Sequence, residues 1–204
     1  VGRVVVVGPV PELEYLAKGK VQAVIPCADT VMANLRRGLD WLKPQDFVLV
    51  ATSDIPLLTA AAVEDFLQRT RSTTADFYYS IVEKSAGEAR YPGVKRTYVR
   101  LKDGTFTGGN LLLVHPRILE RGWGFAEAMV RLRKEPLKMC SVLGWGLVLR
   151  LVLGRLSIAD VERRFAQIIG ATGKAVISPY PEVGIDVDKP SDYELVQRAM
   201  GLGG

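Results

Sequence analysis

Short apolar runs alternate with segments of helical periodicity along most of the chain. Runs rich in β-branched residues that end at glycine, proline or a polar turn predict strands at 3–7, 21–25, 47–51, 76–82 and 174–178. Apolar residues at helical spacing, or a capping threonine before them, predict helices at 31–42 and 59–69 and a last helix after residue 190. This alternation predicts a largely parallel sheet that is covered by helices on both faces.

The centre of the chain departs from this alternation. Residues 95–101 alternate between polar and apolar, Asp103-Gly104 is a turn signal, and residues 105–114 follow as a second strand, so a β-hairpin is predicted. The sequence Thr107-Gly108-Gly109-Asn110 lies within it. Two glycines weaken a strand unless another backbone or a ligand approaches closely. A bulge and the approach of a ligand both remain open.

Residues 116–170 have a helical pattern, and we interpret them as a helical insertion. Ser157 followed by Asp160 predicts a helix cap within it. The segment carries Trp123, Trp145 and many leucines, so it could be core, a lid or a dimer face, and core is the simplest interpretation. A homodimer is therefore left open. A group of basic residues is interpreted as a solvated face that could also meet an acidic substrate: Arg131, Arg133 and Lys134.

The composition favours one domain and a small anionic ligand. A chain of 204 residues with 48% hydrophobic residues can bury one sizeable core, so we expect residues 1–204 to form a single domain. The net charge of +5 suits phosphate-bearing molecules. The 27 basic residues are dispersed and no basic stripe is interleaved with aromatic residues, so we expect no nucleic-acid partner.

The two cysteines indicate a reducing compartment. Cys27 and Cys140 lie far apart among apolar neighbours, which predicts two buried free thiols and a cytoplasmic protein. The apolar run at residues 139–149 is shorter than the roughly 20 residues of a membrane span, so no membrane partner is expected.

The single histidine excludes several mechanisms. One imidazole and two isolated cysteines cannot build a histidine-rich zinc site, and His115 precedes Pro116 at a helix start, where we interpret it as structural. Carboxylates, backbone amides, lysines and arginines remain for chemistry, and this set suits magnesium and phosphates.

Asp54 stands where the buried strand 47–51 ends. In open α/β sheets, ligands bind beyond the carboxyl ends of the strands, so an acid there faces a ligand. Pro56 restricts the loop that carries it. A solvated turn or a helix cap is the alternative.

A second acidic pair lies near the C-terminus. In Ile185-Asp186-Val187-Asp188 the acids alternate with apolar residues, so in a strand both would point to one face. Asp188 also precedes a helix start, where an N-cap is the alternative. Magnesium is typically held by one or two carboxylates plus substrate phosphates, so Asp54 and this pair could converge on one ion.

These two acidic segments carry a resemblance. The sequences Ala51-Thr52-Ser53-Asp54-Ile55-Pro56 and Asp186-Val187-Asp188-Lys189-Pro190-Ser191-Asp192-Tyr193 resemble the acidic motifs of the MobA-like NTP transferases, nucleotidyltransferases of the GT-A type. The resemblance implies a Rossmann-like three-layer αβα fold with a mixed, mostly parallel sheet. It also implies that an acceptor attacks the α-phosphate of an NTP and that pyrophosphate leaves.

The resemblance also assigns residues to roles. Asp54 and Asp188 match the catalytic, Mg²⁺-binding acids, and Asp186 is the alternative second ligand. The segment Thr107-Gly108-Gly109-Asn110 resembles the strand on the acceptor side, with Lys95 and Arg96 as candidates for an acceptor phosphate. Asn34 lies where relatives pass the nucleotide base.

The start of the chain departs from the family. Val1 begins at what resembles the second strand, without the Gly-Gly loop that wraps the triphosphate, so we expect roughly 40 to 60 further residues before it. A GT-A glycosyltransferase is the rival enzyme, but Thr52 stands where its Asp-x-Asp pair would begin. A non-catalytic nucleotide-binding protein is the rival of another class.

Overall fold

A computed structural model describes residues 2–132 and 134–201, without the side chains of residues 136, 137 and 140. Within these residues the strands form two sheets. The larger sheet has the order β3-β6-β4-β7, and β5 pairs with β6 at its end. Its strands are β3 (Val48–Ala51), β4 (Phe77–Glu83), β5 (Val99–Leu101), β6 (Gly104–Val114) and β7 (Gly173–Ser178).

The larger sheet is mixed. β4 and β7 are parallel, and β6 is antiparallel to both β3 and β4, so β3, β4 and β7 run in one direction and β6 opposes them. The prediction of a mixed α/β sheet covered on both faces is confirmed. The hairpin of β5 and β6 also forms, but its first strand is shorter than predicted because residues 95–98 leave the sheet.

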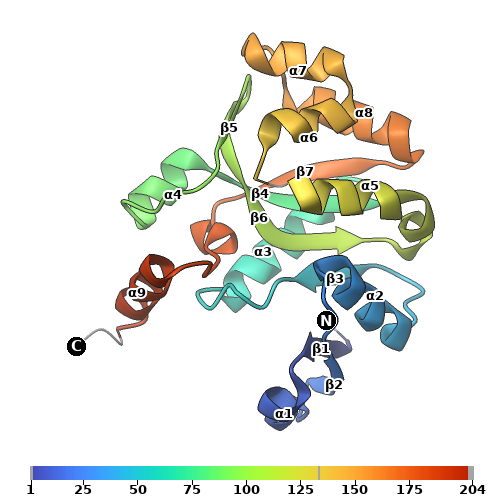
Figure 1. Ribbon diagram of the computed structural model, residues 1–204, viewed down its shortest axis with the longest axis vertical. Coiled ribbons are helices and arrows are strands. Elements are labelled where there is room, and N and C mark those ends of the chain that lie inside the picture. Colours follow the sequence, from blue (N-terminus) through green and yellow to red (C-terminus); the bar gives the residue numbers. More distant parts are fainter. Residues whose placement is uncertain (1, 133, 202–204) are drawn as a thin grey trace.

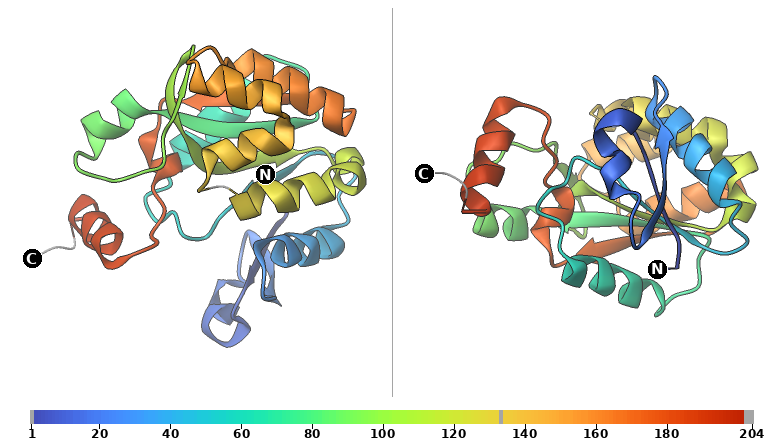
Figure 2. Two further views of the ribbon diagram at one scale, coloured as in Figure 1. Left: turned by 45° about the horizontal axis from the view of Figure 1, so that its top comes forward. Right: turned by 90° about the horizontal axis from the view of Figure 1, so that it is seen from below.

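Helices cover the two faces of this sheet (Figures 1 and 2). α3 (Ala60–Thr70) lies on one face, where Phe66 is fully buried in the core together with Leu111 of β6. On the other face, Phe165 stacks on Phe77 of β4 at 5.5 Å and Phe125 meets Phe165 edge-on at 5.6 Å. These contacts make a three-layer αβα core.

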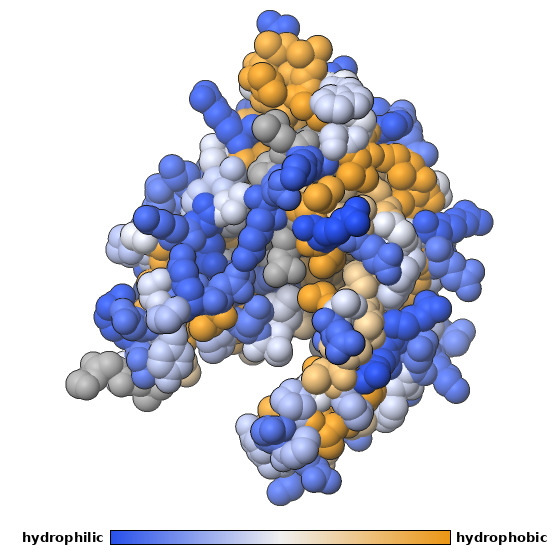
Figure 3. All heavy atoms as spheres, in the orientation of Figure 1, coloured by the Kyte–Doolittle hydropathy of each residue, from blue (hydrophilic) through white to orange (hydrophobic). Residues whose placement is uncertain are grey.

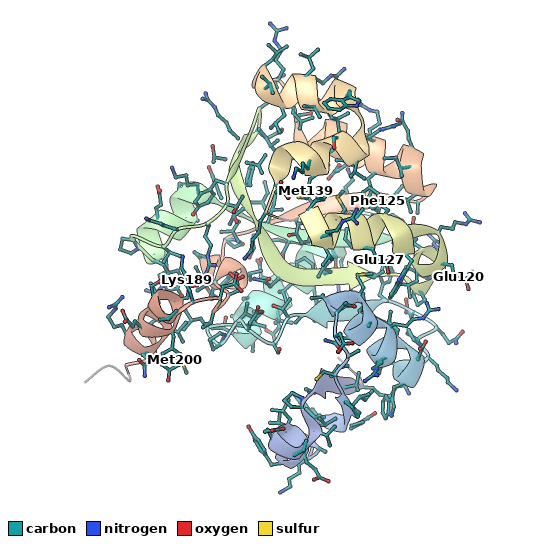
Figure 4. All side chains as sticks on the ribbon, viewed as in Figure 1. Glu120, Phe125, Glu127, Met139, Lys189 and Met200 are labelled. Carbon is teal, nitrogen blue, oxygen red and sulfur yellow. The ribbon has the colours of Figure 1, made fainter. Side chains whose placement is uncertain are left out.

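The second face carries the helical segment predicted at 116–170. Its elements are η2 (Pro116–Ile118), α5 (Leu119–Leu132), α6 (Pro136–Leu143), α7 (Trp145–Val152) and α8 (Ile158–Ile169). Figure 4 marks Phe125 on α5 and Met139 on α6 in this layer. The predicted cap at Ser157 is confirmed as a capping box with Asp160. His115 caps η2, since its Nδ1 accepts a hydrogen bond from the Arg117 amide at 3.2 Å.

The N-terminal residues form a smaller parallel pair of strands. β1 (Val4–Gly8) pairs with β2 (Val21–Pro26), with α1 (Val10–Leu13) and η1 (Glu14–Leu16) between them. α2 (Val31–Leu42) follows, begins at the predicted residue and contacts α5, where Arg36 lies 5.1 Å from the centre of the Trp123 ring. Cys27 is exposed, which contradicts its predicted burial, because it follows β2 in a surface turn. The Cys140 side chain lies outside the described residues.

Three further elements frame the carboxyl ends of β3, β4 and β7: α4 (Lys84–Arg90), η3 (Pro181–Gly184) and α9 (Pro190–Ala199). Figure 4 marks the two ends of α9 with Lys189 and Met200. Among the described residues, no helix is both long enough and apolar enough to cross a membrane.

Candidate metal and nucleotide site

Asp54 lies in the loop that leaves β3. The next residue, Ile55, is only 5% exposed and anchors this loop in the core, while Asp54 itself is exposed. The Asp54 carbonyl accepts a hydrogen bond from the Val187 amide at 2.9 Å. This bond joins the two acidic segments that the sequence places far apart.

The second acidic segment follows η3. Val183 of η3 is fully buried, and its carbonyl accepts a hydrogen bond from Asn110 Nδ2 at 3.1 Å. Residues 185–188 then run as irregular backbone, so the two acids do not lie on one face of a strand. Ile185 is buried in the core, whereas Asp186 is half-buried and Asp188 is exposed.

Asp188 does not cap α9. The N-cap residue is Lys189, and the Asp188 amide donates a hydrogen bond to Asp192 Oδ2 at 3.2 Å. The N-cap position thus belongs to Lys189, and the Asp188 carboxylate lies close to those of the other two acids.

Asp54, Asp186 and Asp188 form one cluster. A carboxylate oxygen from each lies within 4.8 Å of the other two. Oxygens in an octahedral Mg²⁺ shell, at about 2.1 Å from the ion, lie about 3 to 4 Å apart, so only a small contraction would bring the three oxygens onto one ion. An all-oxygen donor set at an accessible position fits a hard divalent cation.

Two cations compensate the charge of this cluster. Arg96 Nη1 donates to Asp186 Oδ1, and Arg96 Nη2 donates to the Asp186 carbonyl at 2.9 Å. The Arg96 side chain is 12% exposed. Lys134, between α5 and α6, lies 3.0 Å from Asp188 Oδ2. These two described ion pairs reduce the repulsion among the three carboxylates.

Two buried polar atoms beside the cluster have no hydrogen-bond partner among the described residues. They are Thr52 Oγ1, two residues before Asp54, and Arg96 Nε. A buried hydroxyl or N–H without a partner costs stability, and such groups concentrate at functional sites.

The glycine pair in β6 has a packing reason. A Cβ at Gly108 would overlap the Tyr79 hydroxyl, and a Cβ at Gly109 would overlap Ser80 Oγ and lie 2.9 Å from Val183 Cγ1. β4 and η3 therefore press closely against this part of β6. The ladder between β4 and β6 is also irregular here, between Tyr79 and Ile81, as the bulge interpretation expects.

The other predicted residues differ in their surroundings. Asn110 and Arg96 contact η3 and the acidic segment, respectively, whereas Lys95 is exposed. Asn34 is in α2, where its Oδ1 accepts a hydrogen bond from the Ala28 amide at 2.5 Å. Its contact is thus with the turn before α2 and not with the acids.

Sequence reasoning missed the partner of Asp188. Lys134 was grouped with residues of a solvated face, and its own side chain is indeed 69% exposed, but it reaches the acidic cluster. Arg133 lies outside the described residues. Near the same end of the sheet, burial and then the Glu182 carboxylate raise the pKa of Tyr91, which the sequence did not suggest.

Comparison with known proteins agrees with this geometry. The family profile of the MobA-like NTP transferase domain matches residues 1–139. A hypothetical transferase from Thermus thermophilus is 43% identical, with a TM-score of 0.78 over 91% of this chain and 77% of that one. A 4-diphosphocytidyl-2C-methyl-D-erythritol synthase from Anaerococcus prevotii shares the fold, with 10% identity and a TM-score of 0.55 over 98% of this chain and 82% of that one. No curated protein matches significantly.

The fold is a Rossmann-like three-layer αβα fold, and its acidic cluster lies at the edge of the sheet where such folds bind ligands. The chain belongs to the family of MobA-like NTP transferase domains.

Proposed function

We propose that this protein transfers a nucleoside monophosphate from an NTP to a small acceptor, releases pyrophosphate and depends on Mg²⁺. The cluster of Asp54, Asp186 and Asp188 carries the proposal, because it offers oxygen ligands at the edge of the sheet where α/β proteins bind ligands. The free thiol of Cys27 and the NTP substrate suit a cytoplasmic protein.

The three acids would hold the cation. Asp54 and Asp188 are the assigned ligands, with Asp186 as the alternative to Asp188. Arg96 holds Asp186 in position, because it donates hydrogen bonds to both the side chain and the carbonyl of Asp186. When bound, the ion supplies charge neutralisation and orientation for phosphate oxygens. Protein side chains need to supply little covalent chemistry in such a transfer.

In the proposed reaction, an acceptor oxygen attacks the α-phosphorus as the bond from this phosphorus to the bridging oxygen breaks. Pyrophosphate leaves with that oxygen. Lys95, Arg96 and the β6 segment from Thr107 through Gly108 and Gly109 to Asn110 are proposed for the acceptor side. Asn34 is proposed for the base, and since its Oδ1 already accepts from Ala28, its amide N–H groups and the second lone pair of Oδ1 would be available.

The test is to incubate the purified protein with each NTP, Mg²⁺ and phosphorylated acceptors, and to measure released pyrophosphate. Asp54→Ala should abolish the Mg²⁺-dependent signal without unfolding the domain, because the residue is exposed. Asp40→Ala is the matched control, since the Asp40 side chain is 70% exposed and lies 3.8 Å from Arg36 in a surface ion pair. Near-normal turnover of Asp54→Ala would contradict the proposal.

Two comparisons separate the remaining alternatives. A larger loss in Asp186→Ala than in Asp188→Ala would make Asp186 the second ligand. Nucleotide binding without pyrophosphate release would favour a binding protein, and turnover of a sugar nucleotide would favour a GT-A glycosyltransferase.

A further inference from the structure

One face of α7 is apolar and exposed. Trp145, Leu149, Val152 and Leu153 are 77%, 60%, 69% and 56% exposed. Their spacing of four and three residues places them on one side of the helix. We call these four residues the α7 face. Figure 3 shows apolar side chains gathered over this end of the molecule. Clustered exposure of this kind indicates a contact with something other than water.

The segment that carries the α7 face is basic. Residues 136–159 contain no acid, and their three charged residues are Lys138, Arg150 and Arg155. Arg155 is exposed at the end of α7, and the side chains of Lys138 and Arg150 are 65% and 55% exposed. Each of the latter two also pairs with an acid outside this segment, Glu135 and Asp160. An apolar helix face with a tryptophan and flanking cations is typical of helices that lie in the interface of an anionic bilayer.

The size and position of the α7 face favour a lipid surface over a second copy of the chain. α7 has eight residues and is therefore about 12 Å long. One face of such a helix is small beside the roughly 800 Å² per partner of a standard protein interface. α7 also lies at an end of the molecule, away from α9 and from β1 and β2 (Figure 1). A protruding face can enter a lipid surface without a complementary groove.

We propose that α7 docks this protein on an anionic membrane surface. The α7 face enters the acyl boundary, while Arg150, Arg155 and Lys138 meet lipid headgroups. The sequence led us to expect no membrane partner because no apolar run can span a bilayer, but a surface contact needs no span. The inference is independent of the proposed nucleotidyl transfer.

Cosedimentation with vesicles tests the proposal. The full chain should pellet with vesicles of phosphatidylglycerol and phosphatidylcholine in roughly a 1:3 ratio, and weakly with phosphatidylcholine alone. Leu149→Ser with Val152→Ser should lower the partition coefficient about tenfold or more, because two exposed apolar side chains are lost. Tyr15→Ser is the control, since Tyr15 is 67% exposed but lies in η1. Equal binding of the double variant and the control would overturn the proposal.

A charge variant gives an independent outcome. Arg155→Glu leaves the α7 face intact and should weaken binding to the anionic vesicles but not to neutral ones. The wild type should also lose binding when salt is raised from about 0.1 M to about 1 M, where the Debye length falls from about 10 to about 3 Å. Vesicle binding that is unchanged by both Arg155→Glu and high salt would overturn the proposal of an anionic surface.

Sedimentation velocity without vesicles tests whether the α7 face binds a second copy of the chain instead. A monomeric wild type supports the lipid surface. A wild-type dimer that becomes monomeric in the double variant, together with no vesicle binding, would assign the α7 face to self-association and overturn the proposal. Circular dichroism of each variant should match the wild type, because the replaced side chains face solvent.

Discussion

Replacing Arg96 with methionine should destabilise the protein in a way that a divalent cation reverses. Arg96 donates to both the side chain and the carbonyl of Asp186, and the side chains of the pair are 12% and 26% exposed. The replacement keeps an apolar stem and removes the charge. Among the described residues, Lys134 would then be the one ion-pair partner left for the three clustered acids.

The magnitude follows from the geometry of the cluster. Two unit charges at 4.8 Å repel by about 3.5 kcal/mol at an effective dielectric constant of about 20. Asp54 and Asp188 are exposed, so water screens part of this repulsion. A fully buried ion pair costs about 3 to 5 kcal/mol when one partner is removed. For this partly exposed site we expect Arg96→Met to lower the free energy of unfolding by about 2 kcal/mol without metal.

Saturating Mg²⁺ should reduce this cost to below about 1 kcal/mol, because the ion replaces the lost positive charge. Linkage then requires the variant to bind Mg²⁺ at least about fivefold more tightly than the wild type. Urea unfolding in chelator and in Mg²⁺ measures the first quantity, and calorimetric titration measures the second. Arg96→Lys is the control, since it keeps the charge but donates from one nitrogen.

Two results would refute this reasoning. A loss of stability that is equal with and without Mg²⁺ would mean that Arg96 supports only packing. Weaker Mg²⁺ binding by Arg96→Met would mean that its positioning of Asp186 outweighs its competition with the ion.

Three further substitutions test the packing, the ion pair and the helix cap that stabilise the fold around the site. Gly109→Ala should cost about 1 to 3 kcal/mol in urea unfolding, because the added Cβ meets the fully buried Ser80; an unchanged midpoint would contradict this packing. Burial acts to raise the pKa of Asp76, but hydrogen bonds from Thr172 and Arg117 outweigh it and lower the pKa below the ordinary value of 3.8. The ionised Asp76 therefore stabilises the fold above pH 3.8, and this stabilisation is lost as pH falls through the lowered pKa. The difference in free energy of unfolding between the wild type and Asp76→Asn should accordingly shrink below about pH 4, which unfolding measured across pH tests. Ser157→Ala should cost about 1 kcal/mol, measured by thermal unfolding, because it removes the capping box; no change would mean that tertiary packing alone fixes the start of α8.

The local patterns of the sequence predicted most of the larger elements. The apolar spacing at 31–42 predicted the bounds of α2, and the β-branched run before Asp54 predicted β3. Such patterns succeed because burial on one face of a helix or in a central strand leaves a regular period. They failed at residues 95–98, where alternation extends over only a few residues and no strand forms. A strand also needs a partner for its backbone, and local alternation does not say whether one is present.

Hydrophobicity alone also misplaced α7 within the helical segment. Trp145 and its apolar neighbours were interpreted most simply as core, yet Trp145 is 77% exposed. A run that is apolar nearly all round contains no polar face to indicate which side meets water. The exposure of α7 depends on how α6 and α8 pack beneath it, which is a property of the tertiary fold.

The sequence predicted some residues of the candidate site but not others. The acids were predicted because each lies in a short local motif, after a strand for Asp54 and before a helix for Asp186 and Asp188. Their cationic partners were not predicted, because Arg96 meets Asp186 across 90 residues and Lys134 meets Asp188 across 54. Those partners change what the cluster does. Among the described residues, Arg96 and Lys134 pair with carboxylates of the cluster, so a divalent ion must compete with arginine and lysine for these oxygens. Lys134→Met should therefore strengthen Mg²⁺ binding as Arg96→Met does, but with a smaller effect on stability, because the Lys134 side chain is 69% exposed.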